Sequence, residues 1–208
     1  MQLPGGERCG LATTLSPQSL PSRDETPPFA DAGELASRRA LALAERVPCG
    51  GSEASLGFDA LQAITPLDPD RWVEGNADLG LPRRCQGKRL ERVGRFSFVS
   101  ALRALAASVA VLELDPLPGE SPAERAAYIL PRSDLIVVTG MALVNRTPKG
   151  LLALCPPGSD VALDGPSVPL SEVLFGYGVS LRCDASVEAP APVTAGIRQA
   201  ANFVQIHP

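Results

Sequence analysis

Four short groups of residues from Gly94 onward have side chains or backbones suited to binding a small anionic ligand. Arginine offers a planar fork of N–H donors to phosphates and carboxylates, and a carboxylate can orient a substrate. Glycine lets the backbone approach a ligand, and hydroxyl and amide groups add hydrogen bonds. The candidate ligand-binding residues are Gly94, Arg95 and Phe96; Glu113 and Asp115; Thr139, Gly140, Asn145, Arg146 and Thr147; and Gly165, Pro166 and Ser167.

The spacing of the first two groups is close to that of a dinucleotide-binding motif. Glu113 follows Gly94 by 19 residues and Asp115 by 21, near the roughly 20-residue offset at which an acidic side chain meets a ribose hydroxyl. Only one glycine stands in the turn at Gly94, so the Gly-x-Gly-x-x-Gly fingerprint is missing. NAD is therefore disfavoured, and the sequence predicts no particular cofactor.

A purely structural interpretation of each group stays open. Gly94 and Gly140 also fit turns that need an unusual backbone conformation, and Glu113 and Asp115 also fit hydrated charges at strand ends. The hydroxyl and amide residues also fit helix caps; these are Asn145, Thr147 and Ser167.

Neither a catalytic residue nor a metal ligand can be assigned. No Ser-His-Asp, Cys-His or paired-carboxylate pattern is present, and the single histidine is His207. The thiols are widely spaced without a Cys-x-x-Cys pair, so neither a zinc site nor a disulfide framework is indicated. The five cysteines are Cys9, Cys49, Cys85, Cys155 and Cys183.

The elements expected to position these groups form an α/β fold. Consecutive Val, Ile and Leu residues, as at 135–138, are typical of a strand buried on both faces of a parallel sheet. The pattern predicts a Rossmann-like, mainly parallel sheet with helices on both faces, and in such sheets ligands bind beyond the carboxyl ends of the strands. The expected strands are 89–93, 109–114, 135–139, 161–164 and 179–182, and the expected helices are 97–107, 122–130, 148–154, 170–175 and 194–202.

Residues 1–87 combine turn-rich loops with helical patterns, whereas strands and helices alternate regularly in the later part of the chain. We expect this first part to form a small α+β domain. A strand is expected at 10–15, followed by a proline-rich loop at 17–29. Asp31 and Glu34 fit a capping box for a helix that reaches Val47. A second helix, 52–64, is expected to end at Thr65, because the residue before Pro66 is disfavoured in a helix.

Composition excludes several classes of protein. The chain has 208 residues, 45% hydrophobic and 20% charged, with a formal net charge of −4. It has no basic run, so a nucleic-acid partner is not expected. No apolar stretch approaches the roughly 18 residues that a bilayer-spanning helix needs, so we expect a cytoplasmic protein without a membrane partner.

Several segments resemble the bacterial and archaeal family of putative heavy-metal chelation proteins, a group of unknown function. The resemblance covers nearly the whole chain, with order and spacing in agreement. Its segments are Cys9–Thr14, Ala54–Leu61, Arg92–Val99, Glu113–Gly119, Thr139–Thr147, Gly165–Gly178 and Gly196–Gln205.

The resemblance implies two domains with a ligand cleft between them. Residues 1–87 would form a shortened domain similar to the enolase N-terminal fold, and 88–208 the Rossmann-like domain. The family pattern has histidine after the first-strand glycine and after the asparagine of the third loop, where this chain has Arg95 and Arg146. Guanidinium groups cannot coordinate a metal, so we expect an anion to bind rather than a bare cation.

The sequence therefore predicts a binding or accessory protein that holds a small anionic or metal-complexed ligand in the interdomain cleft. The alternative is a transferase or lyase acting on a phosphorylated or pterin-like small molecule, and whether the protein is an enzyme stays open. The expected partner is a small-molecule ligand, and a homo-oligomer is neither predicted nor excluded.

Overall fold

The structure is a computed structural model that describes residues 2–3, 6–14, 31–68, 70, 72–73, 77–96 and 99–206. The chain forms two compact units. We call Pro66–Asp184 the sheet unit, and Met1–Thr65 together with Ala185–Pro208 the helical unit. The sequence-based boundary between 87 and 88 falls inside the sheet unit, just before its first strand, and as a domain boundary it stays a prediction.

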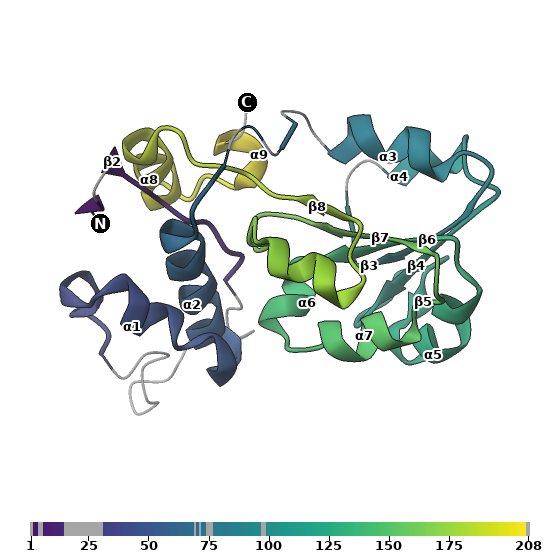
Figure 1. The fold of residues 1–208 in the computed structure, drawn as a ribbon, viewed down its shortest axis with the longest axis horizontal. Coiled ribbons are helices and arrows are strands. Elements are labelled where there is room, and N and C mark those ends of the chain that lie inside the picture. The colour runs from purple at the N-terminus through teal and green to yellow at the C-terminus, as the bar shows by residue number, and fades with distance from the viewer. Residues whose placement is uncertain are drawn as a thin grey trace. The chain divides into compact units, whose positions relative to one another are not determined.

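A six-stranded, all-parallel sheet is the framework of the sheet unit (Figure 1). Its strand order is β5-β4-β3-β6-β7-β8, which confirms the predicted parallel α/β fold. The strands are β3 (Arg89–Val93), β4 (Ser108–Glu113), β5 (Ser121–Pro122), β6 (Leu135–Thr139), β7 (Asp160–Asp164) and β8 (Leu181–Cys183). In the centre, Leu90 of β3 lies opposite Val109 of β4 and Leu135 of β6.

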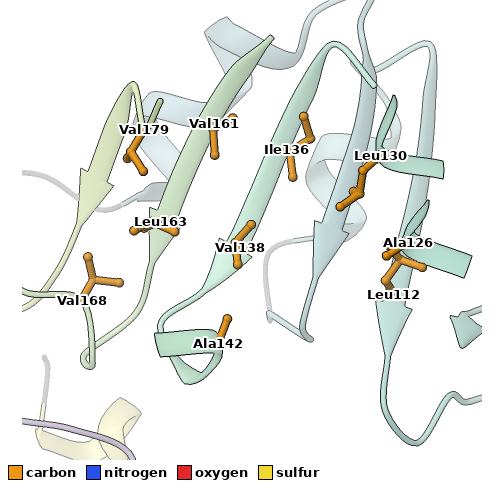
Figure 2. Packing of buried hydrophobic residues seen from close by; sticks show 10 residues of the cluster. All are labelled: Leu112, Ala126, Leu130, Ile136, Val138, Ala142, Val161, Leu163, Val168 and Val179. Carbon is orange, nitrogen blue, oxygen red and sulfur yellow. The ribbon is translucent and has the colours of Figure 1, made fainter. Parts of the chain in front are cut away.

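Helices cover both faces of this sheet because β6 directs apolar side chains to both sides. Ile136 and Val138 pack in a cluster with Leu130 and Ala142 (Figure 2). On the opposite face, Leu135 and Val137 pack in a second cluster with side chains from α3 and α4. The helices are α3 (Ala77–Cys85), α4 (Val99–Arg103), α5 (Ala126–Ile129), α6 (Met141–Val144) and α7 (Pro148–Leu154).

Several of the expected helices are shorter than predicted. The run expected at 122–130 is split into the 3-10 helix Ala123–Arg125, α5 and the 3-10 helix Leu130–Arg132, because Pro131 cannot continue an α-helix. The helix expected at 170–175 is a 3-10 helix, Glu172–Tyr177, and the one expected at 97–107 is described as α4 alone. The C-terminal helix begins earlier than predicted, as α8 (Pro190–Arg198), since proline fits the first turn of a helix.

The helical unit contains α1 (Ala40–Ala44), α2 (Gly51–Ile64), α8, α9 (Phe203–Ile206) and a ribbon of β1 (Gln2–Leu3) and β2 (Gly6–Glu7). The capping box predicted at Asp31 is wrong. The Asp31 carboxylate instead accepts two hydrogen bonds from Arg46, at 2.6 and 3.0 Å, and one from Arg38. These bonds draw Asp31 away from the helix start, and only the 3-10 helix Leu35–Ser37 precedes α1.

The strand expected at 10–15 is extended chain attached to α2 by side chains. The Leu11 N–H donates to Oε1 of Gln62 at 2.8 Å, and the Ser55 hydroxyl donates to the carbonyl of Thr13 at 2.9 Å. These bonds replace a strand ladder over residues 10–14; residue 15 and the proline-rich segment 17–29 lie outside the described residues. Among the helices that the structure describes, none has the length and hydropathy of a membrane span.

Candidate functional site

The strand order creates a topological switch point between β3 and β6 (Figure 1). From β3 the chain proceeds outward through β4 and β5, and it then returns to the other side of β3 to form β6, β7 and β8. Loops that leave β3 and β6 therefore diverge at the carboxyl ends of these strands, where ligands bind in doubly wound sheets. We call this side of the sheet the carboxyl edge.

Gly94 and Thr139 meet at the switch point. Gly94 follows β3 with a φ of 107°, and its N–H donates to the carbonyl of Leu112 at 3.0 Å. A Cβ atom added to Gly94 would lie 2.8 Å from Cβ of Thr139, the last residue of β6. Only glycine fits both the backbone conformation and this close approach.

A second contact joins the ends of β6 and β7. The Gly140 N–H donates to the carbonyl of Asp164 at 2.8 Å, and a Cβ atom on Gly140 would lie 3.1 Å from Cβ of Ser167. Ser167 is buried, and the Gly165 N–H donates to the carbonyl of Cys183 at 3.1 Å. Pro166 has no N–H, so neither of the first two residues of this turn offers a free N–H group to a ligand.

Arg95 is committed to the loop between β4 and β5. Its guanidinium forms a two-pronged ion pair with Glu120, at 2.8–3.1 Å, and also donates to the carbonyl of Asp115. The same carboxylate accepts the Leu117 N–H at 2.8 Å. The pair raises the pKa of Arg95 and lowers the pKa of Glu120. Arg95 thus fastens a loop, while Glu113 at the end of β4 is half-buried.

Asn145, Arg146 and Thr147 form a corner after α6. Arg146 has a φ of 61°. Its N–H donates to the carbonyl of Leu143 at 3.1 Å, and the Thr147 N–H donates to the carbonyl of Ala142 at 3.0 Å. This pair of bonds is the Schellman motif, which ends a helix with one residue in the left-handed conformation.

Two buried charged residues at the carboxyl edge are not evident from the sequence. Arg92 of β3 is fully buried, and its Cζ atom lies 4.1 Å from the centre of the Phe96 ring. Burial lowers the pKa of Arg92 to about 10, and the nearby carboxylate of Asp164 acts in the opposite direction. Asp164 is 8% exposed at the end of β7. The sequence signal that could have revealed Arg92 is a charged residue inside a strand that is predicted to be buried.

The structure thus connects the predicted site residues in three groups. Gly94 meets Thr139; Gly140 meets Gly165 and Ser167; and Arg95 bonds to Asp115. The corner of Asn145, Arg146 and Thr147 is linked to Thr139 and Gly140 through the single turn of α6. That all of them serve one ligand stays a prediction.

The sequence profile of one family matches residues 77–208, more than half of the chain. The chain belongs to the DUF364 family, described as putative heavy-metal chelation. A DUF364 protein of unknown function from Desulfitobacterium hafniense is 26% identical, with a TM-score of 0.70 over 81% of this chain and 70% of that one. A DUF364 protein of unknown function from Pyrococcus horikoshii shares the fold at 18% identity, with a TM-score of 0.69 over 91% and 75% of the two chains. No curated protein matches the sequence.

The donors of this DUF364 protein do not fit a heavy-metal site within the part of the chain that the structure describes. Among those residues, no three His, Cys, Asp or Glu side chains are grouped so that they could hold one ion. Burial raises the pKa of the Cys155 thiol to about 11 and that of Cys183 to about 12. A metal binds the thiolate, so the raised pKa values make both thiols poorer metal ligands than an ordinary cysteine.

Proposed function

We propose that this DUF364 protein binds a small anionic molecule, or an anionic complex of a metal, at the carboxyl edge of the sheet unit. The observation that carries the proposal is the switch point between β3 and β6, where Gly94 lies against Thr139. A parallel sheet of this order opens to ligands at that point. The proposal concerns the sheet unit alone.

One exposed arginine at this edge favours a ligand that carries its own negative charge. Arg146 is exposed on the loop that follows β6, and arginine matches carboxylate and phosphate geometry. A metal in the ligand would arrive already complexed, since no described cluster of side chains fits a bare ion.

An enzyme is the second candidate, namely a transferase or lyase acting on a phosphorylated or pterin-like molecule. Arg92 and Asp164 support it, because buried groups of opposite charge near a ligand site are typical of active sites. Turnover of the bound molecule would distinguish the enzyme from the binding protein.

Native mass spectrometry of freshly purified protein, paired with elemental analysis, would give the mass and metal content of any retained ligand. Hydrogen exchange with and without that ligand would then locate it. We expect protection in residues 94–96, 139–147 and 165–167, with the turn Pro156–Ser159 at the opposite ends of the strands as the internal control. Protection of the control turn alone would refute the proposed site.

A further inference from the structure

The backbone of Arg146 is unusual among the residues that the structure describes. Only two of them other than glycine have a positive φ, Arg146 at 61° and Ala200 at 63°. Both occupy the same position of a Schellman motif, since the Ala200 N–H donates to the carbonyl of Ile197 and the Ala201 N–H donates to the carbonyl of Gly196. Glycine is the usual residue there, because a side chain makes the left-handed conformation unfavourable. Arg146 therefore destabilises its own corner.

No side-chain hydrogen bond or ion pair to the described part of the chain offsets this strain. The guanidinium of Arg146 is exposed and makes neither an ion pair nor a hydrogen bond with any residue that the structure describes. Asn145 beside it is half-buried, and its amide side chain likewise has no hydrogen bond to the described part of the chain. Strained residues without an internal role cluster at sites of function.

The other arginines near the carboxyl edge already have protein partners. Arg92 stacks on Phe96, Arg95 pairs with Glu120, and the guanidinium of Arg182 lies 4.4 Å from the centre of the Phe175 ring. Arg146 can meet a ligand without breaking such a contact. This distinction separates Arg146 from Arg95, which the sequence had grouped together.

We infer that the corner of Asn145 and Arg146 is the oxyanion-binding element of the ligand site. The inference rests on the proposed function and names the chemistry that its ligand must carry, a carboxylate or a phosphate. The helix α6 has four residues and so a length of about 6 Å at 1.5 Å per residue. An extended arginine side chain can span that distance back toward Thr139 and Gly140. The guanidinium fork would take two oxygens of the anion, and the Asn145 amide would add a third donor.

The substitution Arg146→Gly separates strain from function, because it should change stability and binding in opposite directions. Without ligand, its melting temperature should rise by roughly 2–4 °C. Its affinity for the anion should fall at least about tenfold. The probes are inorganic phosphate and malonate, titrated separately by calorimetry, so that the two arms distinguish a phosphate from a carboxylate ligand.

Ala200→Gly is the matched control. It relieves the same backbone conformation in the turn after α8, so its melting temperature should also rise while its anion affinity equals that of the wild type. Arg146→Lys keeps the charge but not the fork, and should weaken anion binding without the gain in stability.

Two results would overturn the inference, and only the second would also overturn the proposed anionic ligand. If the wild type binds an anion and Arg146→Gly binds it equally well, the corner is not the oxyanion element, but the proposed function stands. If the wild type binds neither probe, the oxyanion element and the proposed anionic ligand both fail.

Discussion

Glu91 is a buried carboxyl group on β3, 8% exposed, whose Oε2 atom makes no hydrogen bond within the described structure. Burial raises the pKa of Glu91 to about 7 from an ordinary 4.5. The folded protein therefore holds a proton that the unfolded chain releases, and the free energy of unfolding should fall as the pH rises from about 4.5 through 7. The loss is roughly 3 kcal/mol.

Glu91→Gln should remove this pH dependence, because the amide has no charge to bury. Urea denaturation between pH 5 and 8 would show the variant more stable than the wild type at pH 8 and similar at pH 5. Glu124→Gln, at an exposed position, is the control and should leave the wild-type profile unchanged. Parallel profiles for wild type and Glu91→Gln would contradict the prediction.

Gly94 gives a second prediction for a single residue. Gly94→Ala should destabilise the protein by about 3 kcal/mol, since the new methyl group meets Thr139 at 2.8 Å and the φ of 107° is strained for alanine. Gly158→Ala has a similar φ of 84° but nothing within 4 Å, so it should cost only about 1 kcal/mol. If denaturation showed the same loss of unfolding free energy in both variants, the close approach to Thr139 would contribute nothing to the cost of Gly94→Ala.

One ion pair, between Arg95 and Glu120, holds the loop between β4 and β5 in place. Leu114 and Leu117 are exposed on it, and Glu120 ties the loop to Arg95 and to the Leu117 N–H. Glu120→Gln and Arg95→Met should each increase the rate of proteolytic cleavage within 114–120 several-fold, because either one breaks the pair. The alternative is that Arg95 mainly holds a ligand. In that case Arg95→Met alone would impair anion binding, and the rate of cleavage within 114–120 would equal that of the wild type in both variants.

The central strands could be predicted from sequence because their side chains face apolar layers on both sides. The expected bounds of 89–93 and 135–139 coincide with those of β3 and β6. The edge strand β5 has only Ser121 and Pro122 and no apolar run to signal it. The helix α3 was not predicted, because it contains Pro82, which sequence rules read as a helix breaker.

The candidate site was predictable only in part, for a related reason. Residues at the ends of strands follow from the strands themselves, which is how Gly94 and Thr139 were found. The partner of Arg95 lies 25 positions away in a loop, and sequence spacing does not show which carboxylate reaches it. Arg92 was missed because a charged side chain is normally taken as exposed.

The description of the DUF364 family names heavy-metal chelation. We predict that titration with zinc, nickel and copper will show no stoichiometric submicromolar binding that depends on the carboxyl edge. Guanidinium groups have no lone pair to offer, and their charge repels a bare divalent cation. Cys49→Ser, which removes an exposed thiol, controls for surface binding. Tight binding that is abolished by changes at Asp164 or Asp115 would overturn the prediction.

The helical unit is assembled from two stretches of chain, Met1–Thr65 and Ala185–Pro208, with 119 intervening residues, from 66 to 184, in the sheet unit. A ribosome adds about 5–20 residues per second, so the intervening stretch takes roughly 6–24 s to synthesise. The sheet unit is continuous and can fold as it emerges. The stretch Met1–Thr65 must meanwhile wait for α8 and α9 as a nascent, incomplete domain. The greatest risk of aggregation during synthesis therefore lies with this stretch, which is made before the sheet unit.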